Sequence, residues 1–471
     1  MSDNNKVVKA GVGYTVSNYL LKGLAFFTIP IFTRLMSTAD YGAFNTYAAY
    51  DSILCIIVGM TLHSCFKNAK YKYKNKINEF ISSCILLSFF SLTGWLVIVN
   101  MIYPFISNGL EMSRWIVNVL LLDCTGNAII QYYNSYIGLD YEYKSFFKIA
   151  ALNSVSSVIL SLILMVTICN ENRAIGRILG SAIPVIGIAI WIVFRFWKES
   201  HPSINLGYWK YALKFSGPTI PHGLSQVVLS QFDRIMISNM CGTAQTGLYS
   251  FGYNIYSLML VTANSLDSVW GPWLFENLYN KDFQKIKKVS GQYAFGILVF
   301  SCLIMLAAPE IILILGTQEY RDAIYVVIPI VLGGFYSFLY TLPVQVEYYY
   351  EKTGFIALCS CGAAILNIIL NGIFIPRYGY IAAAYTTLVT YLCYFILHYL
   401  IAIKLSKGKL FNNMTIIGII ILSVLCGIVA LVLIHKMIVR WIAIIIISVC
   451  YGGWLEKKYN FLAIIKSKFR K

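Results

Sequence analysis

A chain of 471 residues with 58% hydrophobic and only 12% charged residues has too little polar side chain to fold as a water-soluble protein. Its net charge of +17 is spread over short loops, which reflects membrane topology rather than nucleic-acid binding. The 12 cysteines lie mostly singly in apolar segments, and Cys359 and Cys361 match no zinc or redox spacing. We therefore expect a membrane protein with no metal and no cofactor.

Apolar stretches of about 20 residues, long enough to cross a hydrocarbon core of about 30 Å, recur along the whole chain. The polar start runs to Lys9 and is followed by an apolar run through Phe32 without a cleavage site, so we expect a retained helix. The runs predict fourteen transmembrane helices, near residues 12–33, 43–66, 80–106, 115–137, 149–169, 174–197, 213–239, 246–272, 290–315, 323–346, 355–375, 380–403, 413–434 and 438–455. A twelve-helix core with a terminal hairpin is an equivalent description.

The basic residues predict the orientation of these helices. With the N-terminus inside, 27 Lys and Arg lie on the cytoplasmic side and 8 lie outside, while Lys22 and Arg234 fall within spans. The cytoplasmic set includes the lysines of loops 67–76, 281–288 and 404–409. We therefore expect both termini in the cytoplasm.

A short repeat suggests how the helices are grouped. Thr38-Ala39-x-x-Gly42 recurs 205 residues later as Thr243-Ala244-x-x-Gly247, at the equivalent point of two hairpins that lie six spans apart. Parallel repeats around a central cavity are typical of transporters. The repeat predicts two six-helix lobes, 1–205 and 206–404, followed by additional helices and a basic tail at 405–471. A chance match between two turn-rich hairpin tips is the alternative.

Three charged residues of the first lobe are predicted near the middle of the bilayer: Lys22, Asp51 and Asp123. A charge at that depth costs at least about 2.5–3.5 kcal/mol, so it normally faces protein or a water-filled cavity. The three side chains are predicted to meet. Lys22 is then a substrate anchor or part of a proton-sensitive switch, or the three form a structural ion pair between helices.

The seventh span carries a polar stripe of His222, Gln226, Ser230 and Asp233, with Arg234 beside it. Their spacing places them on one helix face, which must point inward because lipid cannot satisfy polar groups. The planar fork of Arg234 suits two phosphate oxygens. Because Asp233 and Arg234 lie near the outer end of the span, an anchoring pair is the competing interpretation.

Two further sets of polar residues lie in later spans. Asp267 in the eighth span is a candidate for substrate binding or coupling, or it makes a hydrogen bond between helices. Asn367 and Asn371 are predicted to bond between helices.

The sequence contains no nucleotide-binding P-loop, HExxH motif or G-x-S-x-G elbow, so catalysis is not expected. A membrane polymerase or ligase for polysaccharide is an alternative, although such an enzyme needs a sizeable polar loop, and the connectors here are short.

Two hairpins resemble a known family. The first reads Pro30-x-x-Thr33-Arg34, followed by Tyr41-Gly42, and resembles the opening motif of the polysaccharide flippases called Wzx. These belong to the multidrug/oligosaccharidyl-lipid/polysaccharide (MOP) exporter superfamily. The second hairpin adds Gly217-Pro218-x-x-Pro221, then Asp233-Arg234, Gly242 and Gly247-Leu248-Tyr249-Ser250. The similarity in helix order covers essentially the whole chain.

The resemblance implies a two-lobed, alternating-access flippase that moves undecaprenyl-diphosphate-linked oligosaccharide units to the outer leaflet of the bacterial cytoplasmic (inner) membrane. Such units build O-antigen of lipopolysaccharide, capsule or related polymers, together with a polymerase and chain-length machinery. Fourteen spans depart from the commoner twelve and are typical of peptidoglycan-precursor relatives. A drug/cation antiporter of the same superfamily is the main alternative.

Overall fold

The computed structural model of the protein describes residues 2–110 and 112–459. Throughout these residues the chain is helical, without β-strands, and each predicted span coincides with one long helix or with two consecutive helices. Nine helical segments of the described residues are long and apolar enough to cross a membrane. The prediction of an all-α, multi-pass membrane protein is therefore confirmed.

Five long helices of the described chain are not among those nine segments: α1 (Ser2–Leu35), α2 (Thr38–Gly59), α5 (Arg114–Gly138), α9 (Thr219–Cys241) and α10 (Thr243–Tyr279). They are also the helices that carry all the candidate site residues, from Lys22 to Asp267. Because polar groups are costly in lipid, these are the helices whose polar faces need protein or water beside them.

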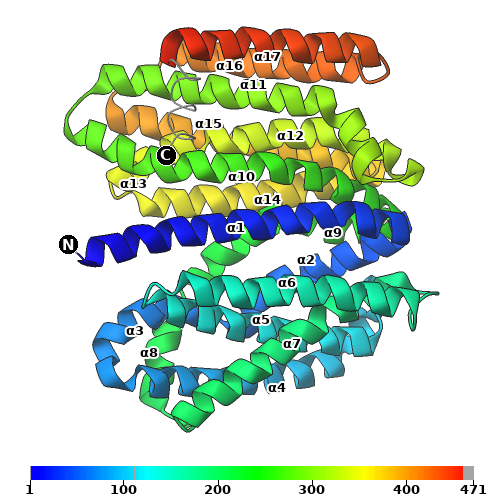
Figure 1. Cartoon of the computed structure of the whole chain (residues 1–471), viewed down its shortest axis with the longest axis vertical. Helices are drawn as coiled ribbons and strands as arrows, with labels where there is room; N and C mark the ends of the chain where they lie inside the picture. The colour runs from blue at the N-terminus through cyan, green and yellow to red at the C-terminus, as the bar shows by residue number, and fades with distance from the viewer. Residues whose placement is uncertain (1, 111, 460–471) are drawn as a thin grey trace. The chain divides into compact units, whose positions relative to one another are not determined.

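The chain folds into two compact units, whose helices are labelled in Figure 1. Unit 1 consists of Met1–Ser250 and Ile368–Tyr380. Besides α1, α2, α5, α9 and the start of α10, its elements are η1 (Leu62–Cys65), α3 (Phe66–Tyr73), η2 (Lys74–Lys76), α4 (Ile77–Leu110), α6 (Tyr143–Val166), α7 (Arg173–Glu199) and α8 (Leu206–Ser216).

Unit 2 consists of Phe251–Asn367 and Ile381–Lys471, so that α10 and α14 (Thr353–Tyr378) contribute to both units. Its other elements are α11 (Phe283–Leu315), η3 (Gln318–Ala323), α12 (Ile324–Leu339), α13 (Thr341–Tyr349), α15 (Tyr380–Ser406), α16 (Asn413–Val432) and α17 (Met437–Tyr459). The lobes predicted from the repeat stay a prediction, and residues 460–471 of the basic tail lie outside the described residues.

Two predicted spans are interrupted for reasons that can be read from the backbone. α2 stops at Gly59 because Met60 and Thr61 are left-handed, with φ of 51° and 47°. The span predicted at 213–239 is divided at Gly217 and Pro218, and Pro218 caps α9, where its missing N–H costs no hydrogen bond.

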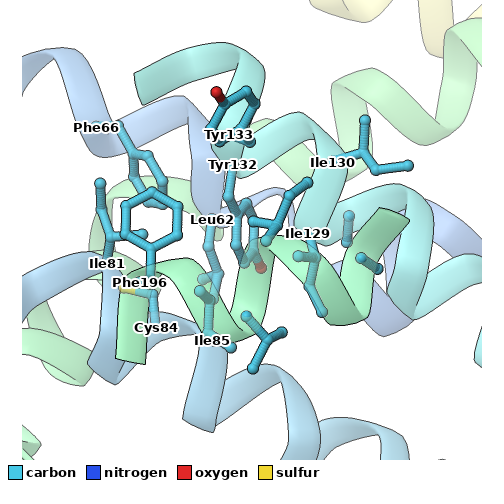
Figure 2. Packing of buried hydrophobic residues seen from close by; sticks show 14 of the residues in the cluster. Leu62, Phe66, Ile81, Cys84, Ile85, Ile129, Ile130, Tyr132, Tyr133 and Phe196 are labelled. Atoms are coloured by element: carbon cyan, nitrogen blue, oxygen red, sulfur yellow. The ribbon is translucent and has the colours of Figure 1, made fainter. Parts of the chain in front are cut away.

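A large core cluster of unit 1 is made of aromatic and aliphatic residues from η1 and from helices α3 to α8. Figure 2 shows Phe66, Tyr132 and Phe196 within it, and the rings of Phe66 and Tyr132 lie 5.3 Å apart. The Tyr132 hydroxyl is buried but satisfied, because it lies 2.8 Å from Ser88 Oγ and donates to the Gly59 carbonyl. This bond fixes the end of α2 against α5.

Unit 2 is organised around α12, whose residues are almost all buried. A Cβ at Gly334 would overlap the ring of Tyr256, so glycine allows α10 and α12 to approach closely. At the edge of the unit, Arg440 of α17 donates two hydrogen bonds of 2.6 and 2.8 Å to Glu310 of α11. This bidentate contact ties the final hairpin, which consists of α16 and α17, to α11.

Candidate functional site

The structure brings Asp51 and Asp123 together in unit 1 through the side chain of Asn127. Asn127 Nδ2 donates to Asp51 Oδ2 and to Asp123 Oδ1, both at 3.3 Å. Tyr47 Oη donates to Asp123 Oδ2 at 2.9 Å, and Cys124 Sγ lies 3.3 Å from Asp51 Oδ1. Hydroxyl, amide and thiol donors thus hold two carboxylates between α2 and α5.

Lys22, which was predicted to join these carboxylates, is exposed on α1. The ion pairs among the described residues do not include it, and α1 packs mainly on α6. Similar depth along two helix axes does not determine which way the side chains point. Asp51 and Asp123 are therefore brought together without Lys22, and the side-chain amide of Asn127 bridges their carboxylates.

Asp51 and Asn127 form part of the wall of a cavity of about 410 Å³ in unit 1. Asp123 is only 4% exposed and lies behind that wall. The cavity is lined by residues of α2, the turn that follows it, η1 and α5, with one residue of α9: Asp51, Ser52, Cys55, Ile56, Gly59, Thr61, His63, Asn127, Ala128, Gln131 and Val227. Its hydroxyl, amide, imidazole and carboxylate groups suit a ligand rich in hydroxyls.

Helical spacing explains how the cavity forms. Asp51 and Cys55 stand four residues apart on α2, as Asn127 and Gln131 do on α5, so each pair lies on one helix face. The left-handed end of α2 then turns the chain so that Thr61 joins the wall. The Thr61 hydroxyl lies 2.9 Å from that of Thr219, which connects the turn to α9.

The sequence reasoning did not select Asn127, Gln131, Thr61 or His63. The spacing of four from Asp123 to Asn127 and again to Gln131 was a usable signal, because it extends the polar face of α5. No local signal marks Thr61 and His63, since both reach the cavity only through the turn after α2.

The polar stripe predicted on α9 is only partly described. His222 lies on α9, but its side chain is outside the described residues. Gln226 and Ser230 are half-buried, and the Ser230 hydroxyl donates to the Gln226 carbonyl of its own helix at 3.0 Å. The α9 residue in the cavity wall is Val227, so the cavity borders the helix beside this stripe.

Asp233 is 1% exposed and fully engaged. Tyr249 Oη donates to its Oδ2 and Asn371 Nδ2 to its Oδ1, both at 2.6 Å. Asp233 thus joins α9, α10 and α14 within unit 1. The predicted interhelical role of Asn371 is confirmed by this bond.

Arg234 is 6% exposed, and its guanidinium lies along its own helix. Its Nη1 donates at 2.9 Å both to the Ser230 carbonyl and to Gln231 Oε1. In this conformation the guanidinium that was predicted to hold phosphate makes these two hydrogen bonds within α9.

Asp267 lies in unit 2. Gln345 Nε2 of α13 donates to Asp267 Oδ1 at 3.4 Å, which is the bond between helices that the sequence allowed. Asn367 Nδ2 likewise donates to Thr387 Oγ1 of α15 at 3.4 Å.

The two repeated glycines lie against each other's hairpin. A Cβ at Gly42 would overlap the Thr243 carbonyl oxygen, and a Cβ at Gly247 would overlap the Thr38 carbonyl oxygen. The relationship is reciprocal: the Gly of each motif contacts the Thr of the other. Equivalent residues contact in this way across a two-fold axis, which supports a true repeat.

The first of these hairpins is also clamped to α7. The Arg177 guanidinium lies 3.9 Å from the ring centre of Phe32 and 4.6 Å from that of Phe44. Arg173 donates to the Leu35 carbonyl, and Asp40 accepts from the Ala174 N–H at 3.3 Å. The motif from Pro30 to Gly42 is therefore built into the packing of unit 1.

Within the described residues, no group of three or more His, Cys, Asp and Glu is arranged to hold a metal ion. The chemistry available in the cavity is hydrogen bonding and charge.

Solved structures show where this fold occurs. The chain is similar to the lipid II flippase MurJ in an inward closed conformation, at 13% identity over 94% of this chain and 98% of that one, with a TM-score of 0.70. It is also similar to an inward-facing MATE family multidrug resistance transporter of the MOP superfamily, at 14% identity over 83% and 95% of the chains, with a TM-score of 0.63. The chain therefore has the fold of these two transporters.

The sequence identifies the family. Residues 7–278, more than half of the chain, match the family described as "Polysaccharide biosynthesis protein". The chain belongs to this family. It is also 23% identical, over 77% of its length and 90% of the relative, to protein 1 of the Lsg locus of Haemophilus influenzae. The family and fold that the hairpin motifs predicted are confirmed.

Proposed function

We propose that the protein is a flippase for undecaprenyl-diphosphate-linked oligosaccharide units, which it moves from the inner to the outer leaflet of the bacterial cytoplasmic membrane. The cavity of unit 1, with the carboxylate, amide and hydroxyl groups in its wall, carries the proposal. The family match supplies the link to polysaccharide, and the likeness to a lipid II flippase supports a lipid-linked substrate. O-antigen or another surface polysaccharide is the proposed product, so a polymerase and chain-length machinery are the proposed partners.

The cavity suits the sugar head group. Sugar hydroxyls that enter an apolar medium without partners cost about 2–7 kcal/mol each, so they need a polar surface during the crossing. Asp51 accepts hydrogen bonds from hydroxyls, while Asn127 and Gln131 both donate and accept them. The polyprenyl tail can stay in lipid, so the protein has to shield only the polar head.

The diphosphate needs a contact outside this cavity, because the carboxylate in the cavity wall repels an anion. We assign the diphosphate contact to Lys22, which is exposed and lies on one of the five less apolar helices. Arg234 remains a second candidate, but it must first release its bonds to Ser230 and Gln231. Outward movement of an anion gains about 2.3 kcal/mol per charge per 100 mV of inside-negative potential. This drive needs both termini to be cytoplasmic, as the basic residues predict.

Alternating access would open and close the contact between the α1–α2 hairpin and the α9–α10 hairpin. The close contact of Gly42 with Thr243, and of Gly247 with Thr38, leaves no room for a head group between these helix starts. We propose that this contact exists in the state that loads substrate from the cytoplasm and opens to release it. During that movement the Asp123–Tyr47 bond would hold α2 against α5, and the Asp233–Tyr249 bond would hold α9 against α10.

A deletion strain tests the proposal. Cells that lack the protein should lose their surface polymer and accumulate lipid-linked units that are accessible only from the cytoplasmic side. A plasmid copy should restore both, and Asp51→Asn at equal membrane abundance should not. Normal polymer in the deletion strain, without accumulation, contradicts the proposal. Chain lengthening by the purified protein in vesicles would favour a polymerase or ligase instead.

The carboxylate in the cavity favours a second candidate, a drug/cation antiporter. Asp51 faces a pocket without Lys or Arg in its wall, as a cation site does. If this is the function, Asp51→Asn abolishes drug resistance and leaves the surface polymer intact.

A further inference from the structure

A second cavity lies at one end of unit 2, and its wall contains none of the residues assigned to the proposed function. It measures about 590 Å³ and is lined by the N-terminal part of α11, the start of α16 and the last turns of α17. Figure 1 shows these three helices side by side, and both α16 and α17 pack on α11. Lys287, Lys288, Phe295, Thr415 and Trp454 are among its lining residues.

The length of α16 indicates the depth of this cavity in the membrane. The helix has 20 residues, which at about 1.5 Å per residue give about 30 Å, the thickness of a hydrocarbon core. Its first turn therefore lies at the level of the lipid head groups. Since Thr415 of that turn lines the cavity, the polar side of the cavity lies at the same level.

The charge around the cavity is strongly positive. Segments 281–295, 407–419 and 451–459 contain eight lysines against two acidic residues, Asp282 and Glu456. Lys409 and Lys458 lie over aromatic rings, 5.8 and 4.4 Å from the ring centres. By contrast, Lys287 and Lys288 line the cavity, and neither takes part in an ion pair with a described residue.

The other side of the cavity is apolar and aromatic. Phe295 stands eight residues after Lys287 on α11, about 12 Å deeper along the helix. Ile419 of α16 and Trp454 of α17 complete this wall, and the Trp454 ring stacks on Tyr451 at 5.7 Å. The cavity thus offers cations at head-group level and an apolar wall below it, which matches an amphiphile better than a small anion.

We propose that this cavity is a binding site for an anionic phospholipid of the surrounding membrane. Its phosphate lies between Lys287 and Lys288, with the Thr415 hydroxyl as a further donor. One acyl chain follows Phe295 and Ile419 into the hydrocarbon region. The bound lipid joins α11 to the hairpin of α16 and α17 at the level where α16 begins.

Native mass spectrometry of the full-length protein tests this site. The protein, delipidated in detergent, is titrated with phosphatidylglycerol, with phosphatidylcholine and with inorganic phosphate. We expect tighter binding of phosphatidylglycerol than of phosphatidylcholine, and no displacement by millimolar phosphate. Each lysine near an anionic lipid contributes about fivefold, so Lys287→Gln with Lys288→Gln should weaken phosphatidylglycerol binding about 25-fold.

The matched control is Lys285→Gln with Lys409→Gln, which removes the same charge at the same end of the unit outside the cavity wall. This control should change binding less than threefold. An equal loss in both double variants contradicts a specific site, as does equal binding of phosphatidylcholine. Displacement by millimolar phosphate contradicts the lipid assignment. If the double variant fails to fold, the single variant Lys288→Gln is tested instead, because Lys288 is exposed. It should bind phosphatidylglycerol about fivefold more weakly. Unchanged binding would overturn the proposal.

Discussion

Gly42 and Gly247 occupy equivalent positions in two hairpins 205 residues apart, and each contacts the backbone of the other's hairpin so closely that neither position has room for a Cβ. This contact gives the short sequence repeat a structural meaning. A match by chance between two turn-rich hairpins does not explain why the two copies of the motif pack against each other.

Gly42→Leu should therefore abolish transport while the protein still inserts. The new side chain meets the Thr243 carbonyl, a rigid backbone atom, so the hairpins cannot close. Surface polymer, measured at equal membrane abundance, should fall at least about tenfold. Gly94→Leu is the control, because nothing lies within 4 Å of a Cβ at that position. Equal polymer in both variants would show that the closed contact is dispensable.

Asp51→Asn should reduce transport with little effect on stability. The change keeps the shape of the side chain but removes the charge that the cavity presents to the substrate. Loss of a hydrogen bond to a charged acceptor is worth about 1.5–3 kcal/mol, or roughly 10–100-fold in transport rate. The readout is uptake of a lipid-linked substrate into proteoliposomes. A rate within twofold of the unchanged protein would remove Asp51 from the binding site.

Tyr47→Phe should have the opposite profile, because its hydroxyl donates to Asp123 behind the cavity wall. Removing this donor leaves a buried carboxylate oxygen without that partner and should cost about 1–3 kcal/mol of unfolding free energy. Thermal unfolding in nanodiscs measures the loss. Tyr71→Phe, at a residue that is 80% exposed, should leave the midpoint unchanged. Equal midpoints for both variants would argue against a stabilising bond.

Lys22→Ala should weaken transport more than Lys22→Arg, because the diphosphate needs a cation at this place and arginine supplies one. At Arg234 we expect the loss in Arg234→Ala to appear in thermal stability as well, since its guanidinium bonds to Ser230 and Gln231. Polymer level and unfolding midpoint should be measured together. Full activity in all of these variants would assign both residues to structure alone.

Arg440→Met should destabilise the final hairpin, and Glu310→Met in the same chain should restore stability. The single change leaves Glu310 largely buried without its partner, which costs about 3–5 kcal/mol for a buried pair. Removing both charges in favour of apolar side chains is close to neutral. Thermal unfolding of the single and the double variant, measured beside the unchanged protein, compares their unfolding free energies. If the double variant is as unstable as the single one, the effect comes from packing rather than from charge.

The sequence by itself determined the helical, multi-pass fold, the places of the long helices and the family. Each of these depends on local information: runs of apolar residues long enough to cross a bilayer, and motifs contained within one hairpin. The breaks at Met60 and Pro218 each divide a predicted apolar segment into shorter helices, but the segment itself was predicted at the right place.

Only the tertiary structure decided which polar groups meet. Sequence spacing predicts similar depth for Lys22, Asp51 and Asp123, but the rotation and packing of each helix select Asn127 rather than Lys22 as the partner of both carboxylates. Asp233 and Asn371 bond across 138 residues, which no local pattern encodes. Depth is a property of one helix, whereas contact depends on how several helices pack together.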